Sequence, residues 1–308
     1  MIFLQNVKDA QKRINKYVKK TPVVEIRDGI FLKLENKQPI VKGFKIRGAA
    51  SSMIFTNKKK VMTSALGTHG FAVGYIGKKL GIKTICMMIT NPPKDAEKKM
   101  KILVDEVMYG TEKFSDTEQM ALRYAKRNNI HFVHPYNDKD VIAGQGTIGL
   151  ELLDQIKDLD AVYVPIGGGG LISGIAVAVK SINPKIKVIG VQPQQMHAMI
   201  DSVKKKKVVA VSSRKSVAEK LAVNLNPKTI TFKIVQKYVD YFIMPTEVEV
   251  KKAMKEINLK TGEVVEGAGA IAYAAALKDR RRKKNVGCVV SGGNISKENF
   301  RKSTGIQL

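Results

Sequence analysis

Short apolar runs alternate with amphipathic stretches along most of this 308-residue chain. The apolar runs predict strands at 60–64, 83–89, 106–109, 131–133, 161–165, 188–191 and 287–290, and the amphipathic stretches predict helices at 69–80, 95–104 and 115–128. We expect Ser115 or Asp116 to cap the last of these helices. Strands that alternate with helices indicate an α/β protein with a mainly parallel sheet. Ligands of such proteins lie at the carboxyl ends of the strands.

The charge balance is strongly basic, with 54 Lys and Arg against 27 Asp and Glu and a formal net charge of +27. Basic runs at 58–60, 204–207 and 280–284 would attract polyanions at low salt. They carry no interleaved aromatic residues, so a solvated lysine-rich surface is the simpler interpretation and no specific nucleic acid is expected as a partner. An inactive relative that binds polyanions through this charge stays open as an alternative.

Three features predict a cytoplasmic location. The sequence has no run of about 18 or more apolar residues, so neither a membrane-spanning helix nor a membrane partner is expected. Its first twenty residues lack the order of a secretory signal peptide. Cys86 and Cys288 lie in apolar, strand-like runs and are expected to be reduced core residues.

The strongest local signal is a run of four glycines at 167–170, which follows an apolar strand and precedes an apolar helix. Glycines let the backbone approach a ligand closely, and the N-terminus of the following helix adds positive potential. The run therefore predicts a phosphate cradle. It is not a P-loop, because no Gly-Lys-Ser/Thr follows, and its spacing differs from a dinucleotide fingerprint.

Three weaker segments each have an ordinary alternative. Lys45, within 43–49, lies beside apolar residues that could lower its pKa and make it a nucleophile, although a lysine in such a context is usually a surface residue. The turn at 64–70 could bind a carboxylate or simply cap a helix. The turn at 291–294 could belong to a site or simply end a strand.

Together these segments resemble the threonine/serine dehydratases of the fold-type II pyridoxal-phosphate (PLP) enzymes, a group that includes serine racemase. The resemblance runs over nearly the whole chain. Its motifs, in family order, are Asp9-Ala10, Arg13-Ile14, Thr21-Pro22, 32–36, the Lys45 segment, 134–138, 143–149, the four glycines, 266–270 and 291–294. The resemblance implies two open, twisted, mainly parallel sheets flanked by helices, as in the tryptophan synthase β fold. It also implies a large PLP-binding domain formed by 1–47 and 143–308, with a small domain at 48–142 inserted in it.

The resemblance also implies roles for individual residues. Lys45 would hold PLP as a Schiff base and later move the proton on the substrate α-carbon. The residues implied to bind the cofactor are Phe44, Lys45, Thr68, Gly167, Gly168, Gly169, Gly170, Leu171, Glu266, Ser291 and Gly292. Those implied to bind the substrate carboxylate are Ser64, Ala65, Gly67, Thr68 and His69. Ser291, a neutral partner for the pyridine nitrogen, would favour prompt loss of a β-leaving group.

The chain departs from the family pattern at several positions. Thr68 replaces the usual Asn, Leu66 is an extra residue in the same turn, and Gly43 replaces Ser before the Phe-Lys pair. Lys220 takes the place of a glycine, where it could crowd the site or contact an anionic substrate. Gln192 replaces an expected carboxylate, so no metal site is expected.

The implied function is an ammonia-lyase that removes water and ammonia from L-threonine or L-serine to give a 2-oxo acid. Racemases place a second Ser opposite the lysine, where this chain has Ala65 or Leu66, which favours elimination over racemisation. The alternatives are a serine racemase-like activity, β-replacement, or β-elimination on another amino acid such as hydroxyaspartate. A homodimer or homotetramer is implied by analogy.

Overall fold

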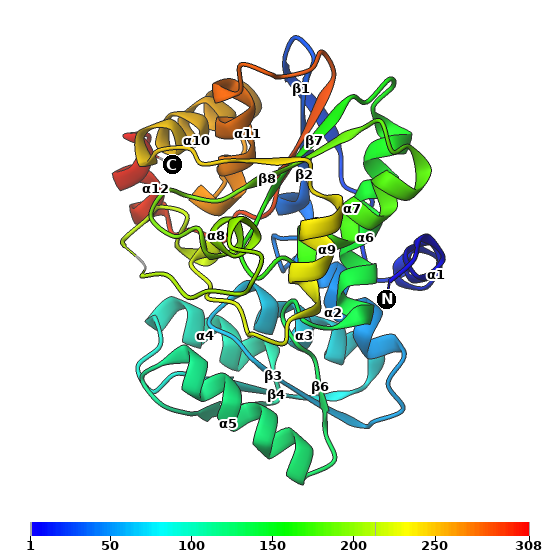
Figure 1. Cartoon of the computed structure of the whole chain (residues 1–308). Coiled ribbons are helices and arrows are strands. Elements are labelled where there is room, and N and C mark those ends of the chain that lie inside the picture. The colour runs from blue at the N-terminus through cyan, green and yellow to red at the C-terminus, as the bar shows by residue number, and fades with distance from the viewer. Residues whose placement is uncertain (1, 213, 308) are drawn as a thin grey trace.

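The computed structural model describes residues 2–212 and 214–307 and contains two sheets (Figure 1). The larger sheet has the order β1 (Val23–Arg27), β2 (Ile30–Leu34), β10 (Val286–Val290), β7 (Ala161–Pro165), β8 (Lys187–Val191) and β9 (Tyr241–Ile243). The smaller sheet has the order β5 (Glu106–Tyr109), β4 (Lys83–Met88), β3 (Lys60–Ser64) and β6 (His131–Phe132). Every pairing except β1 with β2 is parallel. The predicted α/β class is confirmed.

Helices flank both sheets. Those that precede or surround the smaller sheet are α1 (Leu4–Ile14), α2 (Lys45–Ile54), α3 (Thr68–Leu80), α4 (Lys94–Leu103) and α5 (Phe114–Arg127). The remaining helices are α6 (Lys139–Gln155), α7 (Gly170–Ile182), α8 (Ala198–Lys204), α9 (Ile230–Tyr238), α10 (Glu247–Thr261), α11 (Gly267–Lys278) and α12 (Lys297–Thr304). Short 3₁₀ turns occupy Glu35–Lys37 (η1) and Glu219–Leu221 (η2). Figure 1 shows the smaller sheet and α5 forming one lobe below the larger sheet.

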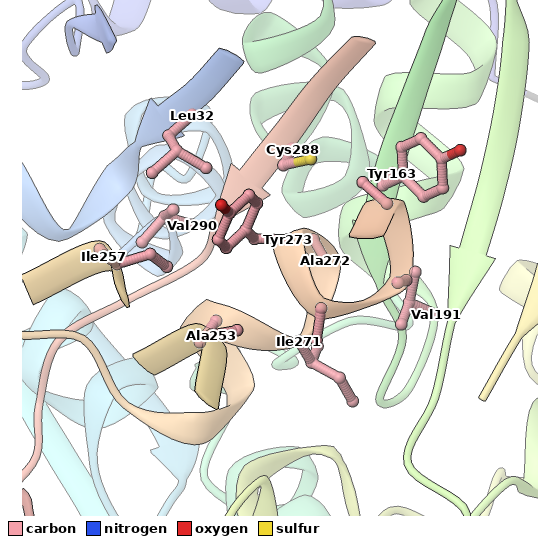
Figure 2. Close-up of a cluster of buried hydrophobic side chains, with 14 of the residues drawn as sticks. Leu32, Tyr163, Val191, Ala253, Ile257, Ile271, Ala272, Tyr273, Cys288 and Val290 are labelled. Carbon is pink, nitrogen blue, oxygen red and sulfur yellow. The ribbon is translucent and has the colours of Figure 1, made fainter. Parts of the chain in front are cut away.

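The larger sheet is buried on both faces, which explains the nearly continuous apolar runs of its central strands. All five residues of β7 and of β10 are buried. One face packs against α10 and α11 in the cluster drawn in Figure 2, where Tyr273 of α11 lies beside Cys288 and Val290 while Ile271 points away from them. The other face packs against α6 and α7. The prediction that Cys86 and Cys288 are core residues is confirmed, since both side chains are buried.

A buried ionic network anchors α2 to the larger sheet. The guanidinium of Arg47 donates to both carboxylate oxygens of Glu35, at 2.8 Å each, and to both of Glu151, at 2.7 and 2.9 Å. Lys33 of β2 also donates to Glu151 at 2.5 Å. Two cations and two anions therefore balance, which is the condition under which buried charges are tolerated. The network fixes the first turn of α2, where Lys45 lies.

The predicted cap of α5 is wrong. The helix begins at Phe114 with Lys113 as its N-cap, so Ser115 and Asp116 lie inside the first turn. A capping side chain must precede the helix on an extended backbone, and Lys113 has that conformation (φ −92°, ψ 128°) but no side-chain acceptor. The other predicted elements agree with the structure to within one residue at each end. The domain boundaries at 47/48 and 142/143 stay a prediction.

Candidate active site

Lys45 is the first residue of α2 and is held from two sides. On one side, Gly43 forms a β-bridge with Gly292, and the Phe44 N–H donates to the Ser291 carbonyl at 3.1 Å. On the other side, the Lys45 Nζ donates to the Pro135 carbonyl at 2.6 Å. Lys45 therefore lies between the end of β10 and the segment that follows β6.

The Lys45 amine is prepared for nucleophilic chemistry. Burial lowers its pKa to about 8, and only the negative charge of Glu118 opposes this lowering. A lysine with such a pKa has a larger unprotonated fraction near neutral pH than an ordinary lysine has. The unprotonated amine is the form that attacks an aldehyde carbon.

The four glycines join β7 to α7, and two of them, Gly168 and Gly170, lie directly against Tyr136. A Cβ atom on Gly168 would lie 2.3 Å from the Tyr136 ring, and one on Gly170 would lie 2.9 Å from its Cα. Gly169 has a φ of +89°, a left-handed conformation that favours glycine. As N-cap of α7, Gly169 offers no side-chain acceptor to the first turn, so the N–H groups there can bind an anion. Tyr136 follows Pro135, so the cradle and Lys45 share one wall.

The turn after β10 forms the opposite wall. The buried Ser291 hydroxyl donates to the Ala268 carbonyl at 2.9 Å. A Cβ on Gly292 would lie 3.0 Å from Glu266 Oε1, so this glycine leaves room for the Glu266 carboxylate. Burial raises the pKa of Glu266, while the Lys220 ammonium beside it acts in the opposite direction. Lys220 contacts this carboxylate and also donates to the Asn294 carbonyl at 2.9 Å.

The turn from Ser64 to His69 does not present all of its side chains to Lys45. The Ser64 hydroxyl donates to the Met87 carbonyl at 3.0 Å, within the smaller sheet. Thr68 begins α3, and its Oγ1 accepts a hydrogen bond from the Asn294 amide at 3.1 Å. Because Asn294 donates in this contact, the Thr68 hydroxyl hydrogen stays free to bind another acceptor.

His69 is neutral, and its tautomer is fixed by its surroundings. Burial and the Lys45 charge lower its pKa to about 3. Its Nε2 lies 3.0 Å from the Val133 carbonyl, which can only accept, so Nε2 carries the hydrogen. The lone pair of Nδ1 is buried and has no partner among the described residues.

Gly43 and Thr68, two of the departures from the family pattern, contact each other. A Cβ atom on Gly43 would lie 2.9 Å from Thr68 Cγ2 and 3.2 Å from the Ser291 carbonyl oxygen. The branched methyl of Thr68 therefore occupies the space that a residue larger than glycine would need at position 43. Each departure accommodates the other.

Sequence reasoning assigned no role to His134, Tyr136 or Glu118. His134 Nδ1 accepts from the backbone N–H groups of Tyr136 at 3.2 Å and of Asn137 at 2.9 Å. Glu118, on α5, places Oε1 3.9 Å from His134 Nε2. The His-Pro-Tyr motif was a signal for the first two residues. Glu118 lies in an amphipathic helix without a motif, so no local signal indicated it.

The residues present fit PLP. The cofactor carries an aldehyde, for which Lys45 is a suitable amine, and a phosphate, for which the uncapped N-terminus of α7 and its glycines are a suitable cradle. The unpartnered His69 Nδ1 is a further acceptor beside Lys45. No group of three or more His, Cys, Asp or Glu residues suited to a metal ion occurs in 2–212 or 214–307.

Comparisons with known proteins show the family of the chain. The profile of the pyridoxal-phosphate dependent enzyme family matches residues 14–292. An L-threonine ammonia-lyase of Thermotoga maritima is 38% identical over 307 residues, covering 96% of this chain and 76% of that protein. A catabolic L-threonine dehydratase of Staphylococcus aureus is 36% identical, covering 96% of this chain and 90% of that protein.

Among solved structures, maize serine racemase superposes with a TM-score of 0.91 at 31% identity, covering 98% of this chain and 96% of that one. The processed form of threonine deaminase isoform 2 from Solanum lycopersicum gives 0.90 at 28% identity, covering 98% and 92%. These neighbours confirm the predicted fold type. This chain belongs to the family of pyridoxal-phosphate dependent enzymes.

Proposed function

We propose that this protein is a PLP-dependent ammonia-lyase that removes water and ammonia from L-threonine or L-serine and releases a 2-oxo acid. The observation that carries the proposal is the position of Lys45, an amine with a lowered pKa between the glycine cradle and the Ser291 turn. The relatives named as threonine ammonia-lyase and threonine dehydratase support this substrate class.

The cofactor would be held by Lys45 and by residues that follow the carboxyl ends of β7 and β10, two parallel central strands of the larger sheet. Gly167, Gly168, Gly169, Gly170 and Leu171 would bind its phosphate through the N-terminus of α7, and Lys45 would hold its aldehyde carbon. The ring would lie among Phe44, Thr68, Glu266, Ser291 and Gly292. When bound, PLP supplies an electron sink that weakens the bonds to the substrate α-carbon.

The chain's own groups would then carry the proton transfers. Lys45 takes the proton from the α-carbon through its Nζ, which a pKa near 8 leaves able to act as a base. The turn formed by Ala65, Gly67, Thr68 and His69 would orient the substrate carboxylate at the N-terminus of α3. Ser64 would support this turn from the smaller sheet, since its hydroxyl already donates to Met87.

The test is release of 2-oxobutanoate from L-threonine by the purified protein loaded with PLP. We expect the bound cofactor to give a visible absorbance band that Lys45→Ala abolishes together with turnover. A protein that binds no PLP, or one whose band survives the loss of Lys45, contradicts the proposal.

A second candidate is β-elimination or β-replacement on an anionic amino acid such as hydroxyaspartate, which Lys220 motivates. The structure gives this lysine another partner, because its ammonium contacts the Glu266 carboxylate and so has its charge matched within the protein. This pairing favours a structural role for Lys220. A comparison of L-threonine with hydroxyaspartate as substrates separates the two candidates.

The resemblance also implies an assembly and a location for the protein. We propose a cytoplasmic homodimer or homotetramer; light scattering after size-exclusion chromatography measures the assembly. None of the helices in the described part of the chain has the length and apolar character needed to cross a bilayer.

An electrophoretic mobility shift with DNA or RNA near physiological salt tests the alternative that the net charge binds polyanions.

A further inference from the structure

Two buried polar atoms near Lys45 have no hydrogen-bond partner among the described residues, namely Glu118 Oε1 and His69 Nδ1. Buried polar atoms in native proteins nearly always have a partner, so an unsatisfied one calls for an explanation. Glu118 Oε1 lies 3.9 Å from Nε2 of His134, and the next residue, Pro135, accepts a hydrogen bond from the Lys45 amine at 2.6 Å. His69 Nε2 lies 3.0 Å from the carbonyl of Val133, the residue before His134. Both side chains therefore lie against the segment 133–135 that also holds Lys45, where a ligand of Lys45 would bind.

Glu118 reaches this place from α5, which belongs to the smaller sheet's lobe (Figure 1). Its side chain is only 12% exposed. The titratable groups that face it are Lys45 from α2, and His134 and Tyr136 from the segment after β6. Lys45 is the only group among these three that can offer it a positive charge near neutral pH, because burial lowers the pKa of His134 to about 3.

His134 presents a hydrogen to Glu118. Its Nδ1 accepts two backbone N–H groups, so in the neutral ring the hydrogen must lie on Nε2. Nε2 lies 3.9 Å from Glu118 Oε1, which is beyond hydrogen-bond distance. The two side chains are therefore neighbours without a hydrogen bond between them, and Glu118 Oε1 has no hydrogen-bond partner among the described residues.

This environment favours a carboxyl group that keeps its proton. Burial raises the pKa of Glu118, and the Lys45 ammonium lowers it by a smaller amount. Catalytic acids are often carboxyl groups whose pKa is raised by burial in this way.

We propose that Glu118 is a further catalytic residue, the general acid that protonates the β-hydroxyl group as it leaves the substrate. The inference rests on the proposed ammonia-lyase function. Asp116, two residues away on the same helix, is exposed and has no such role.

The α-carbon loses its proton to Lys45 Nζ, and the electron pair left behind forms the new bond between the α- and β-carbons. The bond from the β-carbon to oxygen breaks with its electron pair on the oxygen, which takes the proton of Glu118 and leaves as water. Glu118, now a carboxylate, recovers a proton from the Lys45 ammonium, so both groups return to their starting forms.

The experiment compares two leaving groups in Glu118→Gln and in the control Asp116→Asn. Hydroxide needs an acid when it leaves L-serine, whereas chloride leaves β-chloro-L-alanine without one. We expect Glu118→Gln to lower kcat/KM for L-serine by roughly 10²–10⁴-fold and to change that for β-chloro-L-alanine by less than about threefold. Asp116→Asn should leave both values unchanged. Gln has the size of Glu, and no hydrogen bond to the Glu118 carboxyl is lost within the described residues, so the variant should fold.

A second readout needs no turnover. The infrared difference spectrum between the wild-type apoprotein and Glu118→Gln at neutral pH should contain the carbonyl band of a protonated carboxyl group. Absence of that band, or equal losses on both substrates in Glu118→Gln, overturns the inference. A wild-type protein that acts on neither substrate instead overturns the proposed function, so the two failures are distinct.

Discussion

Replacing Lys45 by Met should stabilise the apoprotein at neutral pH, because the lysine is kept in a place that disfavours its charge. Burial lowers the pKa of Lys45 from 10.5 to about 8. This lowering corresponds to at most about 3 kcal/mol, since Lys45 keeps partial contact with solvent. Methionine also leaves the Pro135 carbonyl without its donor, which costs about 1 kcal/mol. The expected net gain is roughly 1–2 kcal/mol.

The free energy of unfolding depends on pH because the pKa of Lys45 differs between the folded and the unfolded states. Between pH 8 and 10.5 the unfolded chain holds a proton on Lys45 that the folded protein has released, so the stability of the wild type rises with pH across this window. Below pH 8 the penalty is fully present, and above 10.5 it is gone. The advantage of Lys45→Met should therefore be largest at pH 7 and should vanish near pH 10.5.

The assay is urea unfolding of both apoproteins, followed by circular dichroism, at pH 7 and at pH 10. Lys16→Met, at an exposed lysine, is the matched control and should leave the free energy of unfolding within about 0.5 kcal/mol of the wild type. Equal free energies of unfolding for the wild type and Lys45→Met at pH 7, with the same dependence on pH, would refute the reasoning. The lysine would then be an ordinary solvated one.

Two further predictions concern packing around α2. Gly43→Ala should destabilise the protein by about 1–3 kcal/mol, because its Cβ meets Thr68 Cγ2. Adding Thr68→Ser to the Gly43→Ala variant should restore about 1 kcal/mol. A double-mutant cycle in which the two changes in free energy of unfolding simply add would contradict the contact. Glu151→Ala removes one of the two buried anions that balance Arg47 and Lys33, and should lower the free energy of unfolding by about 3–5 kcal/mol. The measurement is the midpoint of urea unfolding. A decrease in the free energy of unfolding of less than about 1 kcal/mol would mean that the network is well hydrated.

The order of strands and helices could be predicted from the sequence because its signals are local. An apolar run such as 161–165 and an amphipathic stretch such as 69–80 each contain their own pattern, and the structure places both within one residue of the prediction. Lys45 differs, because its own neighbourhood is more typical of a surface lysine than of a catalytic one. It could be singled out only through the resemblance, whose motifs lie before and after it along the whole chain.

Glu118 could not be predicted, for a physical reason. It lies 73 positions from Lys45 in the sequence, on a helix whose alternation of polar and apolar residues is fully explained by packing against the smaller sheet. Its proximity to Lys45 depends on where α2 and the His134 segment are placed by the tertiary fold. No pattern within residues 114–127 contains that information. The same limit applies to the cap of α5, where Lys113 differs from every residue that capping rules favour.

Three of the departures from the family pattern have a matching neighbour in space. Gly43 makes room for the methyl of Thr68, and Lys220 places its charge against Glu266. A changed residue that is matched by its neighbour alters the site less than it would alone, so these three positions argue weakly for a new substrate. Glu118 Oε1 is buried without a hydrogen-bond partner among the described residues, and we propose it as the acid for the leaving hydroxyl. On that proposal, the preference between a hydroxyl and a better leaving group depends more on Glu118 than on the positions where the chain departs from its relatives.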